Sequence, residues 1–354
     1  MIDIALLRTD PGLLRRTAAR RGAAVDLDRI VELDTELRQA SARSGVLRAQ
    51  HRRHAMSREQ VDVDAARALQ EDLRAVAEQV GALQKDRDEL WGRLPNLLPD
   101  DTPAGGSVEV RHGGDPVAAE ETGGAEVAVE GHAGWRGDGA RLAWAVVTHV
   151  QSLLLARGFT PMTTNQNVVG YYGDQIIDAV DLPIRVGAFA PCPRDAAGDA
   201  DRGAYHAPSV EQVVLCRPED AEHWWDECQR NIEGILRDLE LPYRVLRVCA
   251  GDLRAAAYQE YETQSWFPGV GAYRKTHLNS HFTDYQTRGF KIRYLDRGRV
   301  TQPHSLAATA VTDRAMLAIL ENHVRPDGSV RIPEVLRPYL GGQKAIEPKA
   351  IRPR

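Results

Sequence analysis

Two long stretches near the N-terminus share a hydrophobic repeat with alternating steps of three and four residues. The first places apolar or small side chains at Ile30, Leu33, Leu37, Ala40, Ser44 and Leu47. The second gives Ala66, Leu69, Leu73, Val76, Val80, Leu83 and Leu90, interrupted only at Arg87. Such a repeat is typical of the seam of a coiled coil. Because the polar segment MSREQVDVD joins the two stretches, we predict one antiparallel hairpin about 45 Å long.

The hydrophobic pattern changes after this hairpin. LPNLLPDDTPAGG ends the arm with three prolines, and residues 99–125, rich in Gly, Pro and acids, are expected to form a linker or short edge strands. Residues 126–354 alternate between amphipathic helical stretches, such as residues 217–241, and short apolar strands, such as residues 243–250. We therefore predict an α+β protein, with a coiled-coil arm at residues 1–98 and an antiparallel sheet flanked by helices at residues 126–354.

Charge adds a candidate binding surface. The formal net charge of the 354-residue chain is −5, so any surface that binds nucleic acid has to be a local patch. The expected tip of the arm is such a patch, because residues 41–58 hold no acid. Its arginines are Arg43, Arg48, Arg52, Arg53 and Arg58. We predict that this tip binds phosphate groups, and the simpler alternative is a solvated helix end.

The cysteines and the N-terminus indicate the compartment. Four cysteines without CxxC spacing favour reduced thiols. The opening MIDIALLRTDPG carries acids early and lacks a long apolar core, so no signal peptide is expected. No stretch approaches the roughly 20 apolar residues that a membrane helix needs. We expect a cytoplasmic protein without a membrane partner.

Several stretches resemble the seryl-tRNA synthetases, a family of class II aminoacyl-tRNA synthetases. They are MIDIALLRTDPGLLRR and VDLDRIVELDTELR at the N-terminus, LWGRLPNLLPDDTP at the exit of the arm, and LPYRVLRVCAGDLRAAAYQEYETQSWFPGVGAYR and LAILENHVRPDGSVRIPEVLRPYLGG further on. The resemblance implies a class II catalytic domain, a homodimer, and an arm that grips the long variable arm of serine tRNA. Its first motif, which builds the dimer interface, keeps a helix but has its proline displaced to Pro161.

The resemblance also implies a site for ATP and Mg²⁺, and many of the expected residues differ. The second class II motif keeps Arg194 as its phosphate-binding arginine, but its glutamate falls on Ala196. Its adenine-stacking phenylalanine falls on Val210, and its substrate-binding glutamate falls on Val214. A preceding Thr-x-Glu segment has no counterpart in this chain.

The stretch YRKTHLNSHF shows the sharpest change. The resemblance assigns a metal-binding glutamate to the position of Lys275, and a lysine cannot ligate Mg²⁺ as a carboxylate does. The third motif keeps Arg314 for the γ-phosphate but loses its glycines, and its serine-recognising asparagine is Ala307. We therefore expect that ATP and Mg²⁺ binding is lost, and Arg194 and Arg314 are either anion ligands or structural ion-pair partners.

Three functions follow. In the first, a degenerate family member binds tRNA or another protein, such as the true synthetase, and no longer activates serine. In the second, the fold serves a different reaction in a specialised biosynthetic pathway, one that depends on tRNA or on a metal. In the third, the chain is a divergent but active serine–tRNA ligase. We favour the first, because the substituted positions belong to one site.

A zinc site would support the second function. His277 and His281 are four residues apart on an expected strand, so both face the same side. Cys192, together with His206 and His304, belongs to segments that line the same pocket in the family. These side chains are of the types that bind Zn²⁺. The alternative, which we favour, is that these histidines are polar filler in a vacated cleft.

Overall fold

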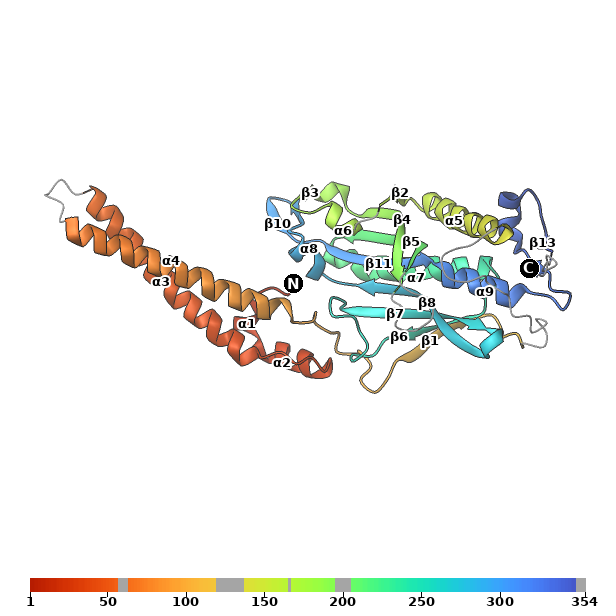
Figure 1. Cartoon of the computed structure of the whole chain (residues 1–354), viewed down its shortest axis with the longest axis horizontal. Coiled ribbons are helices and arrows are strands. Elements are labelled where there is room, and N and C mark those ends of the chain that lie inside the picture. Colours follow the sequence, from red (N-terminus) through yellow and green to blue (C-terminus); the bar gives the residue numbers. More distant parts are fainter. Residues whose placement is uncertain (57–62, 119–136, 165–166, 195–204, 348–354) are drawn as a thin grey trace, which may run out of the picture. The chain divides into compact units, whose positions relative to one another are not determined.

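The computed structural model describes residues 1–56, 63–118, 137–164, 167–194 and 205–347 (Figure 1). The chain divides into two compact units, Met1–Leu97 and Leu98–Arg354. Each unit is described by itself below. Among the described residues, no helix is long and apolar enough to cross a membrane.

The first unit is entirely helical in its regular elements. Two short helices, α1 (Leu6–Thr9) and α2 (Pro11–Arg20), precede the long helices α3 (Leu27–Met56) and α4 (Val63–Gly92). The long helices pack against each other as an antiparallel hairpin (Figure 1). Seam residues such as Ile30, Leu33 and Val76 are buried, as the repeat requires. The helical arm expected from the sequence is therefore confirmed.

Arg87 interrupts the seam because it reaches a buried carboxylate. Asp34 on α3 accepts hydrogen bonds from Arg8 Nε at 2.9 Å and Nη2 at 2.7 Å. The Asp34 carboxylate also lies 3.3 Å from Arg38 Nε and 3.5 Å from Arg87 Nη1. One acid thus ties α1, α3 and α4 together. The Arg8 hydrogen bond is the main reason that the pKa of Asp34 is lowered.

The second unit is built on an eight-stranded sheet with the order β1-β6-β7-β8-β11-β5-β4-β2. All neighbours are antiparallel except β2 and β4. The strands are β1 (Val108–Gly113), β2 (Thr160–Thr163), β4 (Ile184–Arg194), β5 (Tyr205–Cys216), β6 (Tyr243–Arg247), β7 (Gln259–Phe267), β8 (Ala272–His281) and β11 (His304–Val311). Strand β1 falls within the segment 99–125, so part of the expected linker is an edge strand of this sheet.

Helices cover one face of the large sheet. They are α5 (Asp138–Ala156), α7 (Ala221–Asp238) and α9 (Asp313–His323), and their apolar stripes form the main core with strand residues such as Val214 and Leu306. A smaller sheet of β3 (Ile176–Asp178), β9 (Arg293–Asp296) and β10 (Arg299–Thr301) forms a second apolar cluster with α6 (Val168–Tyr171). Two short strands, β12 (Val330–Arg331) and β13 (Ala345–Ile346), pair near the end of the described chain, and α8 (Tyr285–Gly289) follows β8. The α+β class is confirmed.

Candidate functional site

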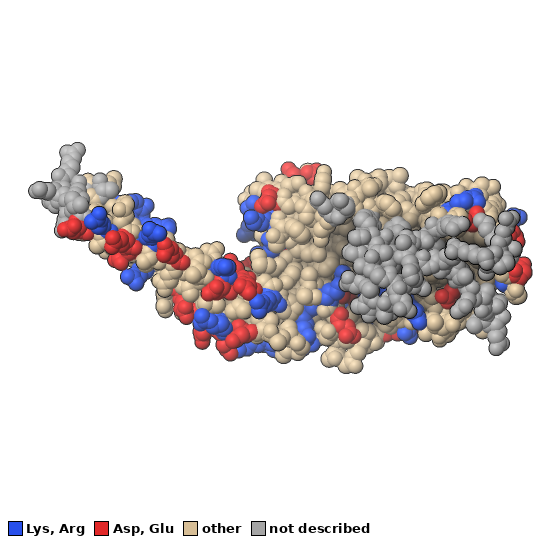
Figure 2. Space-filling view, in the orientation of Figure 1, with Lys and Arg blue, Asp and Glu red and all other residues tan. Residues whose placement is uncertain are grey.

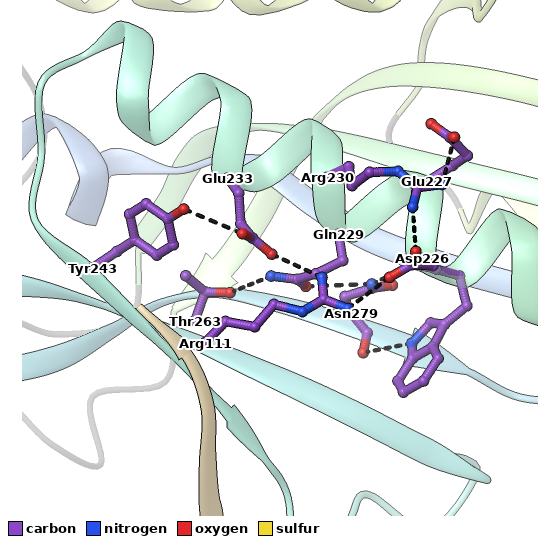
Figure 3. Close-up of polar contacts among 10 residues, drawn as sticks. Arg111, Asp226, Glu227, Gln229, Arg230, Glu233, Tyr243, Thr263 and Asn279 are labelled. Carbon is purple, nitrogen blue, oxygen red and sulfur yellow. Dashed lines mark hydrogen bonds and ion pairs between the residues drawn. The ribbon is translucent and has the colours of Figure 1, made fainter. Parts of the chain in front are cut away.

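Strand β8 carries most of the stretch YRKTHLNSHF, and its side chains divide between the two faces of the sheet. Asn279 faces α7, because its Nδ2 donates to the Trp225 carbonyl at 2.8 Å and its own carbonyl accepts from Trp225 Nε1 at 3.3 Å (Figure 3). His277 and His281 share this face by strand alternation. Lys275 lies on the other face, since the pairing with β7 shifts by one residue at Thr276.

The α7 side of β8 is filled by a structural network. Gln229 Nε2 donates to Thr263 Oγ1 at 3.1 Å, and Arg111 bridges Asp226 at 2.7 Å and Glu233 at 3.0 Å (Figure 3). These contacts join α7 to β1 and β7. Polar side chains on this side therefore hold the helix on the sheet.

The geometry does not support the candidate zinc site. His277 and His281 share a face, but four residues of strand separate their backbones by about 13 Å. They also have different partners: His277 Nδ1 lies 2.8 Å from Thr276 Oγ1, whereas His281 Nδ1 lies 3.3 Å from Gln259 Nε2. No group of three His, Cys, Asp or Glu side chains suited to a metal occurs among the described residues. The side chain of Cys192 lies outside that part of the chain.

His281 pairs with His304 instead. The His281 Nε2 lies 3.1 Å from His304 Nδ1, and the His281 Nδ1 lies 3.6 Å from Glu222 Oε1. Burial lowers the pKa of His304 to about 4, with His281 as a secondary cause. Burial likewise lowers the pKa of His277 to about 4. Both His304 and His277 are therefore neutral near pH 7, which suits side chains packed between helix and sheet.

The opposite face of the sheet carries the charged side chains of β5 and β7, and we call it the polar face. Its described members on β5, β7, β8 and β11 are Glu211, Glu260, Glu262, Gln264, Lys275, Ser280 and Thr309. Their cross-strand partners place them together: Glu260 pairs with Ser280, Gln264 with Lys275, and Thr309 with Glu211. This is the face on which any site built from these strands has to lie.

Lys275 stands at the centre of a small ion cluster. Its ammonium lies 3.1 Å from Glu262 Oε2, and Gln264 Nε2 donates to Glu262 Oε1 at 2.6 Å. Gln264 in turn accepts from Arg244 Nε at 2.9 Å. Both carboxylate oxygens of Glu262 thus have a donor, and a metal ion at this point would face an ammonium group.

Glu260 is also neutralised within the fold. Its carboxylate accepts from Arg254 Nε at 2.7 Å and from Ser280 Oγ at 2.5 Å, and Arg254 also bonds to Ser280. Only 2% of Glu260 is exposed. A buried carboxylate with these donors serves structure.

The expectation that Val210 and Val214 line the site is wrong. Both belong to the core on the α7 side, and the residue between them, Gln212, donates to the Cys228 carbonyl on α7 at 3.2 Å. Strand alternation therefore puts Glu211 on the polar face, where Thr309 Oγ1 donates to its carboxylate at 3.2 Å. The sequence held a signal for this, since Glu211 is the only acid in the apolar strand SVEQVVLC.

The remaining residues of the expected site are only partly placed. Arg314, in the first turn of α9, is exposed, and its Nη1 donates to the Lys275 carbonyl at 3.3 Å. Ala307 pairs with Ser280 and packs against two apolar clusters. Arg194 ends β4 opposite Tyr205, but its side chain is outside the described structure, as is Ala196. Arg314 thus contacts the main chain of Lys275, the other cation of the expected site that the structure describes.

The arm carries two kinds of arginine. Toward its base, Arg29 lies 3.0 Å from Glu32 and Arg93 lies 2.6 Å from Glu89, and Figure 2 shows cations and acids interspersed along the arm. Nearer the tip, Arg74 of α4 pairs with Glu78 at 3.0 Å, but four arginines of α3 are exposed and have no hydrogen bond or ion pair to any described residue. These are Arg43, Arg48, Arg52 and Arg53, whereas Arg58 lies outside the described range.

Comparison with known proteins fits this fold. Residues 158–323 match the family model of the tRNA synthetase class II core domain (G, H, P, S and T), so the second unit contains a class II synthetase core. Residues 1–98 match the seryl-tRNA synthetase N-terminal domain. Serine–tRNA ligases of Streptomyces coelicolor and Cutibacterium acnes are 31% and 30% identical, over 99% and 98% of this chain and the full length of both relatives. The chain belongs to the seryl-tRNA synthetase family.

Solved structures give the same result. The seryl-tRNA synthetase of Pyrococcus horikoshii, determined as a complex with ATP, has a TM-score of 0.86 and 28% identity over 99% of this chain and all of that one. The cytoplasmic serine–tRNA ligase of Naegleria fowleri has a TM-score of 0.84 at 24% identity, which shows the shared fold.

This chain is shorter than its relatives. The alignment with the Cutibacterium acnes ligase spans 422 positions, and this chain has 354 residues, so at least 68 positions lack a residue here. Because the alignment reaches both ends of the relative, the missing positions are internal deletions.

Proposed function

We propose that this protein binds tRNA through its arm and does not carry out the Mg²⁺-dependent activation of serine by ATP. The observation that carries the proposal is the Lys275 ammonium 3.1 Å from Glu262 on the polar face. The resemblance assigns a metal-binding carboxylate to this position. An ammonium there repels a dication by an energy of several kcal/mol at close range, even at an effective dielectric constant of ~20.

Further features of the polar face support the loss of activation. Gln264, the cross-strand neighbour of Lys275, is an amide, and its oxygen already accepts from Arg244. Glu262 is held by Lys275 and Gln264, so it is poorly placed to ligate Mg²⁺. Ala307 offers a ligand no hydrogen bond from its side chain. Internal deletions relative to active ligases are also consistent with a changed site.

The binding half of the proposal rests on the arm. Four exposed arginines of α3 near its tip have no partner among the described residues, while Arg29 and Arg93 near the base are paired with acids. A phosphate backbone would supply the missing counter-charges. The relatives of this chain are named as ligases that act on tRNA, which makes tRNA, and serine tRNA first, the expected partner.

An active serine–tRNA ligase is the second candidate. Glu211 favours it, because this carboxylate on the polar face is suited to bind the ammonium group of an amino acid. The full-length match to serine–tRNA ligases favours it as well. A retained amine-binding carboxylate is compatible with both candidates, since binding of serine does not require its activation.

Serine-dependent exchange of pyrophosphate into ATP separates the two. With purified protein, Mg²⁺ and saturating serine, we expect no exchange above background, and we expect that Lys275→Glu alone does not restore it, because Ala307 and the deletions remain. The Streptomyces coelicolor ligase is the positive control. Robust exchange by the unmodified protein would establish the second candidate.

A further inference from the structure

We propose that His281 and His304 form an acid-sensitive latch, which joins the ends of β8 and β11 while both imidazole rings are neutral and opens when the pair is protonated. The inference goes beyond the proposed function, because the latch lies on the α7 side of the sheet and involves neither the arm nor the activation of serine.

The latch is the last link of a hydrogen-bond chain whose direction is fixed at its other end. Arg247 on β6 can only donate, and its Nη2 lies 2.6 Å from Gln259 Oε1. This contact orients the Gln259 amide, so that its Nε2 lies 2.7 Å from Glu222 Oε1 and 3.3 Å from His281 Nδ1. Because an amide nitrogen is a donor, His281 Nδ1 is an acceptor and carries no hydrogen.

The direction of the chain also sets the tautomer of each histidine. A neutral imidazole has one nitrogen with a hydrogen and one without. Since Nδ1 of His281 is the acceptor, its Nε2 carries the hydrogen and donates to His304 Nδ1 at 3.1 Å. His304 Nδ1 therefore also lacks a hydrogen. The whole chain from Arg247 to His304 is made with two neutral rings.

The latch lies where two neighbouring strands end. His281 is the last residue of β8, and His304 is the first residue of β11. Main-chain bonds surround the pair: Phe282 N donates to the Ser305 carbonyl at 3.0 Å, and Ser305 N donates to the Thr283 carbonyl at 2.9 Å. These amides therefore report on whether the two strand ends stay together.

Ionisable groups from several elements surround the two rings. Glu222 Oε1 lies 3.6 Å from His281 Nδ1 and favours a proton on that ring. Burial, and then His281, lower the pKa of His304 to about 4, although Asp284 and Glu222 act in the opposite direction. The ionisable groups are Glu222 of α7, Arg247 of β6, Tyr258 before β7, Cys216 of β5 and Asp284 after β8.

Added protons break the chain because they turn acceptors into donors. A proton on His304 Nδ1 faces the N–H of His281, and a proton on His281 Nδ1 faces the N–H of Gln259. Each case costs a buried hydrogen bond, and two charged rings also repel each other. Separation of the strand ends brings the charged rings into water. It also loosens Ser280, which precedes His281 and donates to Glu260 on the polar face.

The pKa of His304 gives the pH range of the latch. Folding lowers this pKa from its ordinary value of 6.5 to about 4, so the stabilisation is complete above roughly pH 6.5 and is lost as pH falls toward 4. With these two values, the equilibrium constant for opening rises on the order of 50-fold between pH 7 and pH 4.5.

Amide hydrogen exchange of the full-length protein at pH 7 and pH 4.5 tests the latch. After correction for the intrinsic pH dependence of exchange, protection of the Phe282 and Ser305 amides should fall about 50-fold. Nitrogen NMR of the histidine-labelled protein at pH 7 tests the chain itself. We expect the ring hydrogen on Nε2 of both His281 and His304.

Two variants make the exchange test specific. His304→Gln retains an acceptor for the His281 N–H but cannot be protonated, so protection should fall less than fivefold over the same pH range. His277→Gln is the matched control, because His277 lies on the same strand and has a pKa lowered to about 4, but it contacts Thr276 and is outside the chain. It should leave the 50-fold fall at Phe282 and Ser305 unchanged.

Three results would overturn the inference: protection at Phe282 and Ser305 that does not fall at pH 4.5, a fall in His304→Gln as large as in the unmodified protein, or a ring hydrogen on Nδ1 of His281 at pH 7. The NMR measurement uses the unmodified protein, so it decides the direction of the chain even if His304→Gln does not fold.

Discussion

The buried side chain of Asp34 links three helices of the arm. It is 2% exposed and binds arginines from three helices, Arg8 on α1, Arg38 on α3 and Arg87 on α4. A carboxylate this enclosed is stable only while its cations surround it. The same contact explains why an arginine is tolerated in an otherwise apolar seam.

We predict that Asp34→Asn destabilises the arm by about 1–3 kcal/mol, because a half-buried arginine cluster loses its counter-charge. The measurement is thermal unfolding followed by far-ultraviolet circular dichroism at pH 7, where the helical signal of the arm should be lost at lower temperature. Glu78→Gln is the control, since Glu78 forms an exposed pair with Arg74 and its removal should change little.

The effect of Asp34→Asn on stability should also depend on pH. The Arg8 hydrogen bond lowers the pKa of Asp34 in the folded state, so the stabilisation is present above the unfolded pKa of roughly 4 and is lost as pH falls through the lower folded value. The difference in melting temperature between the unmodified protein and Asp34→Asn should therefore shrink below about pH 4. A difference that stays constant from pH 7 to pH 3 would contradict this account.

At the scale of elements, the arginines near the tip of the arm differ from those near its base in whether they have acid partners. Near the base, Arg29 and Arg93 are paired with neighbouring acids, which leaves them little affinity for an outside anion. Near the tip, Arg43, Arg48, Arg52 and Arg53 of α3 have no acid partner among the described residues. The hypothesis that the tip binds tRNA depends on this contrast between two ends of one helical hairpin.

We predict that Arg48→Glu, Arg52→Glu and Arg53→Glu together weaken tRNA binding strongly. If each arginine contacts one phosphate, the slope of log affinity against log salt should fall by roughly three. A filter-binding assay with serine tRNA at several salt concentrations measures both effects.

The matched control for the tip changes three arginines near the base of the arm in the same way, Arg15→Glu, Arg29→Glu and Arg93→Glu. These side chains are exposed but already paired with acids. This control should bind more tightly than the tip variant. Equal binding by the tip variant and the unmodified protein would show that the tip is a scaffold or a protein-docking element.

At the scale of the whole molecule, helix α5 presents an exposed apolar surface that could form a dimer interface. Helix α5 carries Trp144 at 71% and Leu155 at 59% exposure, although its other side is fully packed in the main core. A large aromatic side chain so exposed on a packed helix is a good candidate for an interface. The resemblance to dimeric synthetases places the first motif at this helix.

We predict that the full-length chain is a dimer at micromolar concentration, and that Trp144→Glu with Leu155→Glu shifts it toward a monomer. Multi-angle light scattering after gel filtration measures the mass, and circular dichroism confirms that the double variant is folded. Thr148→Glu is a milder control on the same helix. A monomeric unmodified protein would show that the altered first motif no longer forms its interface.

The sequence by itself determined a large part of this protein. The repeat of three and four residues fixed the helical arm, because side chains three and four apart share one side of a helix. The acid-free segment 41–58 determined the positive charge on the α3 side of the tip, and Lys275 determined the sign of one charge on β8. These are local properties, and local spacing and composition are sufficient to read them.

Only the tertiary structure decided which face of each strand is covered by helices and which face carries the polar side chains. Alternation says that Glu211 and Val214 point to opposite sides, but the covered side is set by α7, which follows in the chain and packs across several strands. The shift at Thr276 moves Lys275 to the face of Glu262, and no repeat predicts such a bulge. Likewise Arg87 looked like a break in the seam until Asp34, far away in sequence, proved to be its partner. Long-range pairing sets these contacts, so they could not be read from spacing.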